Sequence, residues 1–110
     1  KVIFIADGKL DAVIDDVLAC GADGFFAECH TDLEALSRRY GKDKVLVGNL
    51  DGRIIEQGGR EDIRREVERC VRFGKDCPGY FFCVGNHLTH TIPPENIRFY
   101  FEVAQELGQR

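Results

Sequence analysis

Four short segments of the chain are continuously apolar and rich in β-branched or aromatic residues, without the alternation of a strand that has one wet face. Strands of this kind are buried on both faces, as in parallel sheets. The pattern therefore predicts four strands of a parallel sheet, at residues 2–6, 24–27, 45–48 and 80–84.

A segment with helical periodicity follows each predicted strand. Ile63, Val67, Cys70 and Val71, for example, form one apolar stripe at helical spacing. The other three stripes contain Leu10, Val13, Ile14, Val17 and Leu18; Leu33, Leu36 and Tyr40; and Ile97, Tyr100, Phe101, Ala104 and Leu107. The chain is thus predicted to consist of four consecutive β/α units.

Glycines and capping residues mark the predicted helix boundaries. We expect left-handed glycine caps where the helices end, at Gly21, Gly41, Gly74 and Gly108. Thr31 with Glu34 predicts a capping box, and the proline pair at 93–94 suits a helix start.

Parallel strands joined by right-handed crossovers have all their carboxyl ends at one edge of the sheet. The connections after the predicted strands lengthen along the chain, to residues 49–59 and 85–92, whereas the turns at the opposite edge are mostly short. Long loops at one edge are typical of a functional edge.

Composition narrows the class of protein. The 110 residues are 44% hydrophobic and 31% charged, which is ordinary for one globular domain, and the net charge of -4 gives no reason to expect nucleic-acid binding. No apolar run approaches the ~20 residues of a membrane span. Five cysteines without a paired spacing favour a reducing, cytoplasmic setting.

Polar residues of chemically useful types come directly after the predicted strands. They are Asp7, Glu28, Cys29, His30, Asn49, Asp51, Asn86, His87 and His90. Asp, Glu and His are zinc ligands, and a catalytic zinc has three protein ligands and an open position. Asp7, Glu28 and His87 are therefore candidate zinc ligands, although their long separations match no compact metal motif and only the shared edge links them.

Plainer interpretations stand beside these. Asp7 with Gly8 forms a turn dipeptide in its own right, and histidines in a polar loop, such as His87 and His90, are commonly just exposed. Asn49 and Asp51 either bind substrate or tie the following loop, and Cys29 is either a ligand or a small filler.

The remaining candidates are structural. Cys20 and Cys70 fall on the inner stripes of helices and are interpreted as core residues. The charged run at residues 60–72 is interpreted as a solvated helix face with paired charges.

Four separated motifs resemble the C-terminal half of the uroporphyrinogen decarboxylase superfamily. They are residues 47–51 (Val-Gly-Asn-Leu-Asp), 60–63 with 66–70, 85–87 (Gly-Asn-His) and 93–97 (Pro-Pro-Glu-Asn-Ile). The superfamily fold is a (β/α)8 barrel, so the resemblance implies strands five to eight of such a barrel. It also explains why 110 residues fall short of the ~250 of a closed barrel.

Residues 1–110 are therefore expected to form one half-barrel domain of the α/β class, cut from a longer chain. Either the N-terminal half of the barrel or self-association would cover its open edges. The isolated half is expected to be inactive.

The motifs also bear on the branch of the superfamily. The decarboxylase has Pro-Gly-His-Gly after its last strand, whereas residues 84–87 here read Val-Gly-Asn-His. The coenzyme M methyltransferases have His-x-Cys after the fifth strand, whereas residues 5–8 read Ile-Ala-Asp-Gly. The chain looks closer to the divergent branch of anaerobes that passes a methyl group from methoxy compounds or methylamines to a corrinoid protein.

This resemblance implies zinc-assisted methyl transfer, with Asp7, Glu28 and His87 as the oxygen-rich ligand set. Asn49, Asp51 and Asn86 would bind the small-molecule substrate, and Cys29 or Asn86 would orient the zinc ligands. The alternative is decarboxylation of a tetrapyrrole acetate, for which this half offers few basic residues at the strand ends. A second alternative, from another class, is a non-catalytic α/β binding module.

Overall fold

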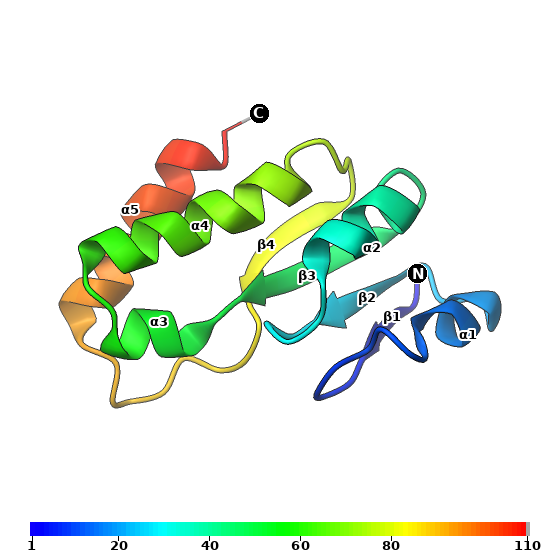
Figure 1. The fold of residues 1–110 in the computed structure, drawn as a ribbon, viewed down its shortest axis with the longest axis horizontal. Coiled ribbons are helices and arrows are strands. Elements are labelled where there is room, and N and C mark those ends of the chain that lie inside the picture. The colour runs from blue at the N-terminus through cyan, green and yellow to red at the C-terminus, as the bar shows by residue number, and fades with distance from the viewer. Residues whose placement is uncertain (110) are drawn as a thin grey trace.

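The computed structural model describes residues 1–109 and contains one four-stranded, fully parallel sheet. The strands are β1 (Ile3–Ile5), β2 (Gly24–Ala27), β3 (Val45–Leu50) and β4 (Tyr80–Val84), and they lie side by side in chain order (Figure 1). The predicted fold class is confirmed: strands and helices alternate as in half of a (β/α)8 barrel.

Within residues 1–109, five helices connect or follow the strands: α1 (Ile14–Ala19), α2 (Leu33–Tyr40), α3 (Gly52–Gln57), α4 (Arg60–Gly74) and α5 (Pro94–Leu107). The short helix α3 is a correction, because residues 49–59 were predicted to be a connection. Its six residues are fewer than two turns, which is too short for a hydrophobic period to show in the sequence. By contrast, α5 begins at Pro94 as the proline pair predicted. None of the helices in residues 1–109 has the length and apolar character needed to cross a membrane.

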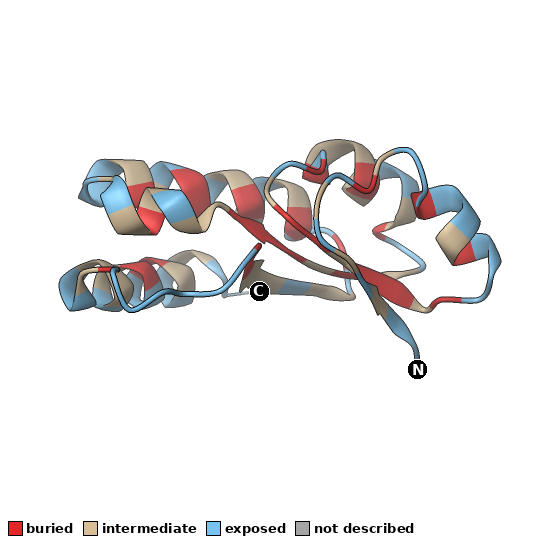
Figure 2. Ribbon diagram, turned by 90° about the horizontal axis from the view of Figure 1, so that it is seen from below, coloured by how far each residue is buried: buried red, intermediate tan, exposed pale blue. Residues whose placement is uncertain are grey.

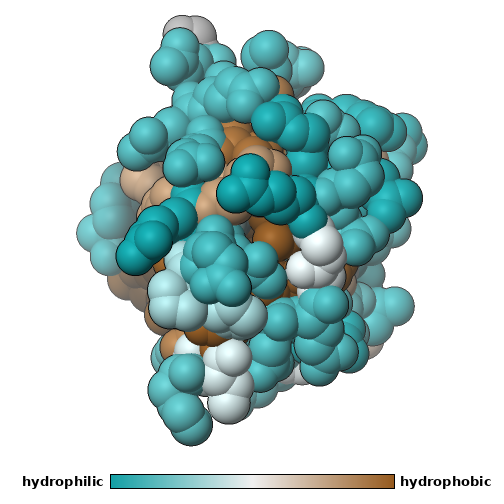
Figure 3. Space-filling model, turned by 90° about the vertical axis from the view of Figure 1, so that its left-hand side faces the viewer, coloured by the Kyte–Doolittle hydropathy of each residue, from teal (hydrophilic) through white to brown (hydrophobic). Residues whose placement is uncertain are grey.

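The core consists of two clusters of buried side chains. Phe25 and Leu46 pair in register in the middle of the sheet and pack with α1 and α2 in one cluster. The second cluster joins the ends of β3 and β4 to α3, α4 and α5, with Ile63 and Val67 of α4 fully buried. Figure 2 shows the buried segments running through the middle strands and the inner sides of the helices. A small apolar area remains visible among hydrophilic side chains at the end of the molecule that α3, α4 and α5 form (Figure 3).

The two outer strands expose apolar side chains. Ile5 of β1 is 69% exposed and Phe81 of β4 is 62% exposed, and the register places both on the same face of the sheet. The prediction that all four strands are buried on both faces is therefore wrong for β1 and β4. The physical reason is that each is an edge strand with a neighbour on one side only among residues 1–109.

Several local predictions are corrected as well. The N-cap of α2 is Asp32, whose carboxylate accepts a hydrogen bond from the Ala35 backbone N–H, so Thr31 and Glu34 do not form a capping box. Of the four predicted left-handed glycine caps, only Gly21 has a positive φ. Helices α2, α4 and α5 end instead with right-handed C-cap residues, whose backbone N–H groups donate to carbonyl groups of the last turn.

The helix stripes are only partly confirmed. Cys70 is fully buried as predicted, whereas Cys20 is exposed because it follows the last turn of α1. Val13 and Phe101, assigned to inner stripes, are also exposed.

Candidate functional site

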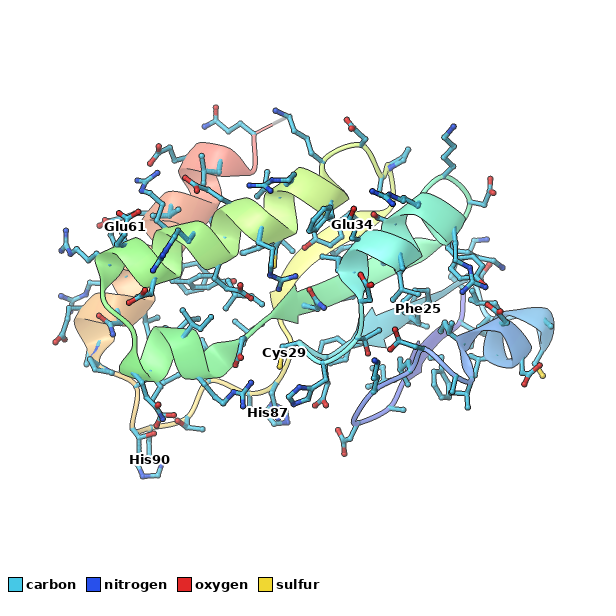
Figure 4. All side chains as sticks on the ribbon, in the orientation of Figure 1. Phe25, Cys29, Glu34, Glu61, His87 and His90 are labelled. Atoms are coloured by element: carbon cyan, nitrogen blue, oxygen red, sulfur yellow. The ribbon has the colours of Figure 1, made fainter. Side chains whose placement is uncertain are left out.

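A cleft of about 350 Å³ lies at the carboxyl ends of the strands. Its walls come from the segments after β2, β3 and β4, which contribute Glu28, Cys29, His30, Asp51, Arg53, Asn86 and His87 among others. Figure 4 shows Cys29 and His87 close together at this edge, and His90 further along the same loop. Parallel strand direction alone brings these distant sequence positions together.

Arg53 and Asp51 form a two-point ion pair in the cleft. The Asp51 carboxylate caps α3 by accepting the Arg53 backbone N–H at 3.0 Å, and it also accepts from the Arg53 guanidinium, with Nε–Oδ1 at 3.0 Å and Nη2–Oδ2 at 2.7 Å. The guanidinium hydrogen bonds lower the pKa of Asp51 below its ordinary value, and the same contacts raise the pKa of Arg53. Both groups are therefore charged at neutral pH.

The Arg53 side chain remains about two-thirds exposed although it is paired. It is a functional candidate that our sequence interpretation missed. The available signal was its position, two residues after an Asp that ends a buried strand. His30 was noticed at the strand ends but was not assigned a role. It lies on the cleft wall.

Glu28 has a structural contact as well as a place on the cleft wall. Its side chain is buried, and Oε2 accepts a hydrogen bond from the Gly8 backbone N–H at 2.6 Å. Glu28 therefore holds the loop that follows β1. Asp7, the neighbouring residue in that loop, is exposed and is not among the residues that line the cleft.

The predicted zinc ligands were tested against this arrangement. Glu28 and His87 share the cleft, but residues 1–109 contain no group of three His, Cys, Asp or Glu side chains placed to hold a metal ion. The donor set in this structure therefore does not fit the predicted three-ligand zinc site. Zinc binding and the corrinoid-carrying partner stay predictions.

The predicted substrate-binding residues divide into two groups. Asp51 and Asn86 line the cleft, and the Asn86 side chain accepts a hydrogen bond from the His87 backbone N–H at 2.7 Å. Asn49 is fully buried beneath it, where its amide donates to the backbone carbonyls of Glu28 at 3.2 Å and Thr31 at 2.8 Å. In this structure Asn49 ties the end of β3 to the segment after β2.

Cys29 is half-buried on the cleft wall between these groups. Burial raises the pKa of its thiol, and the nearby Asp51 carboxylate raises it further. The thiol therefore stays protonated at neutral pH. A protonated thiol is a poor nucleophile.

Comparisons with known proteins show sequence similarity to a known family. A protein-family model described as uroporphyrinogen decarboxylase matches residues 1–107. Similar curated proteins include uroporphyrinogen decarboxylases of Pelobacter propionicus (27% identical over 97 residues), Geobacter sulfurreducens (28% over 98) and Alkalilimnicola ehrlichii (30% over 97). The matches cover 88%, 89% and 88% of this chain, and 28%, 28% and 26% of the respective relatives. The chain thus spans little more than a quarter of the length of these relatives.

Proposed function

Because the chain belongs to the uroporphyrinogen decarboxylase family, as the match over residues 1–107 shows, we propose that it supplies four β/α units of a decarboxylase that acts on tetrapyrrole acetates. The family suggests an enzyme rather than a binding module. The observation that carries the proposal is the presence of Arg53 and of the imidazoles of His30 and His87 in one cleft at the carboxyl ends of the strands.

Decarboxylation of a ring-bound acetate places two demands on a protein. Cationic groups must hold the carboxylates of the substrate, and a proton must reach the carbon skeleton when the bond to the leaving carboxyl carbon breaks. The acetate then becomes a methyl group, and CO₂ leaves. Arg53 answers the first demand, because a guanidinium binds carboxylates through paired hydrogen bonds.

The imidazoles answer the second demand. Histidine gives and accepts protons near neutral pH, and His30 and His87 reach the cleft from two different loops. Either imidazole is placed to protonate a substrate in the cleft. We therefore assign carboxylate binding to Arg53 and proton supply to this pair of histidines.

Methyl transfer to a corrinoid protein, which the motifs after the first and last strands favoured, receives no support from the comparisons. All three relatives named above are called decarboxylases. The sequence pattern also placed few basic residues at the strand ends, which counted against decarboxylation. Folding places Arg53, from the start of α3, at that edge.

The proposal is tested by incubating the natural-length protein with uroporphyrinogen under reducing conditions and separating the products by their number of carboxylates. We expect products that lack one or more carboxylates. Arg53→Gln should raise KM about tenfold or more, because a hydrogen bond to a charged group contributes ~1.5–3 kcal/mol. Arg38→Gln, on the exposed side of α2, is the matched control and should leave KM unchanged.

Two results would refute this function. One is demethylation of a methoxy compound with a corrinoid protein and no release of CO₂ from uroporphyrinogen. The other is an Arg53→Gln variant with the kinetics of the unmodified enzyme.

A further inference from the structure

We propose that Glu66 and Arg69 of α4 are positioning residues, which hold Asp51, and through it Arg53, in place at the cleft. The kinetic test of this inference rests on the proposed function, whereas its hydrogen-exchange test does not. The sequence pattern placed both residues on a solvated helix face. In the structure Glu66 is only 8% exposed and Arg69 is half-buried, and both side chains contact the end of β3.

The first part of the argument is the contact between Glu66 and Asp51. Glu66 Oε1 accepts the backbone N–H of Asp51 at 3.0 Å. Arg69 holds the same carboxylate through two hydrogen bonds, from Nε to Oε2 at 2.9 Å and from Nη2 to Oε1 at 2.7 Å. A carboxylate held at two points by a guanidinium has one orientation. The Asp51 backbone is therefore attached to a rigid acceptor.

The second part is the contact between Arg69 and Asn49. Arg69 Nη2 also lies 3.2 Å from both the backbone carbonyl oxygen and Oδ1 of Asn49. The amide of Asn49 donates in turn to the backbone carbonyls of Glu28 and Thr31. One guanidinium therefore contacts the end of β3 directly and, through Asn49, the loop after β2.

The third part is the location of the pair relative to the chemistry. Neither Glu66 nor Arg69 lines the cleft, so neither touches a substrate held there. Their effect passes through Asp51, which carries the Arg53 guanidinium on its carboxylate. A displacement of about 1 Å in a binding group is enough to lower a rate substantially. Glu66 and Arg69 are therefore positioning residues and not catalytic residues.

The test compares two lysine substitutions on the same helix. Arg69→Lys keeps the positive charge but loses the two-point contact with Glu66. Arg64→Lys is the matched control, because Arg64 makes an equivalent contact with Glu106 of α5, at 3.1 and 2.9 Å, away from the cleft. In the natural-length protein we expect Arg69→Lys to lower kcat/KM for decarboxylation about tenfold or more and Arg64→Lys to leave it unchanged.

A second readout does not depend on activity. Hydrogen exchange measured by mass spectrometry on the segment that contains Asp51 should speed up at least tenfold in Arg69→Lys and not in Arg64→Lys. If the unmodified protein does not decarboxylate uroporphyrinogen, the proposed function fails, and this exchange measurement still decides the positioning role. If Arg69→Lys does not fold, Glu66→Gln replaces it and should show the same faster exchange.

Unchanged exchange at Asp51 in a folded Arg69→Lys or Glu66→Gln protein would overturn the inference. So would equal loss of kcat/KM in the Arg69→Lys and Arg64→Lys proteins, because that result would report a general effect of the helix.

Discussion

Single side chains at the strand ends combine structural and functional contacts. Asp51 caps α3 and also holds the Arg53 guanidinium, while Glu28 lines the cleft and holds the loop after β1. A substitution at either position therefore changes a local hydrogen bond as well as the chemistry of the cleft. Two predictions follow from these contacts.

The Asp51 carboxylate should make stability depend on pH in the acidic range. Its pKa in the folded state is lowered below the ordinary value of 3.8, so its stabilisation is present above that value and is lost as the pH falls through the lowered pKa. At pH 7 Asp51→Asn should lower the free energy of unfolding by at most about 1 kcal/mol, because Arg53 is largely exposed. Asparagine keeps the helix cap.

Denaturant titrations at pH 7 and near pH 2 measure this difference, which should shrink at the lower pH. Asp43→Asn, at an exposed position, is the control. A gap between Asp51→Asn and the unmodified protein that stays constant with pH would contradict the assigned ionic contact.

Glu28→Gln should lower the free energy of unfolding by about 1 kcal/mol even when a chelator is present. The glutamine oxygen still accepts the Gly8 N–H, but the hydrogen bond is no longer assisted by charge. Thermal unfolding in EDTA measures the effect, and Asp7→Asn is the control at an exposed position in the same loop. A Glu28→Gln protein of unchanged stability in EDTA that has lost bound zinc would instead favour the zinc interpretation of this side chain.

At the scale of elements, α4 connects the core to the site. Its inner face packs with α5 and the end of β3, and its side chains Glu66 and Arg69 reach the backbone of residues 49–51. Packing of the apolar face of α4 therefore determines where Glu66 and Arg69 contact the end of β3.

Val67→Ala should test this packing. Val67 is fully buried in the middle of α4, so removing its two methyl groups loses apolar burial and leaves a cavity, at a cost of about 2 kcal/mol in the free energy of unfolding. Val13→Ala is the control with the same chemical change at a 46% exposed position, and it should cost under about 0.5 kcal/mol. Chemical denaturation compares the two, and equal losses would mean that α4 does not pack as described.

At the scale of the whole molecule, the sheet has two unpaired edges and one open apolar face. β1 and β4 each have one strand neighbour among residues 1–109, and Ile5 and Phe81 lie exposed on the same face. In a closed barrel this face would be interior. The remainder of a barrel or a second copy of the chain remains the predicted cover.

The 110-residue chain studied by itself should associate and should not turn over uroporphyrinogen. Unpaired strand edges and exposed apolar side chains favour pairing with another chain. Sedimentation velocity should show dimers or larger species, and the double variant Ile5→Lys with Phe81→Lys should reduce them. Val13→Lys, on the helix side of the sheet, is the control. A stable monomer with full activity would contradict the half-barrel interpretation.

Much of the fold follows from local patterns in the sequence. Continuous apolar runs and helical stripes are properties of neighbouring residues, and together they predict alternating β/α units with parallel strands. The family resemblance follows in the same way from contiguous motifs such as residues 47–51. The cleft-lining positions of Glu28, Cys29, Asp51, Asn86 and His87 also follow, because each comes just after a strand.

Tertiary structure decided the roles of the polar side chains. Arg53 lies in the cleft wall because a short helix begins at Gly52. Asn49 is instead buried, because its side-chain amide donates hydrogen bonds to two backbone carbonyl groups in the segment after β2. Glu66 and Arg69 lie inward because the end of β3 presents a backbone N–H and a carbonyl group at that point. Hydrogen bonds depend on atoms that are 15 to 21 residues apart in these contacts, so no pattern of adjacent residues encodes them.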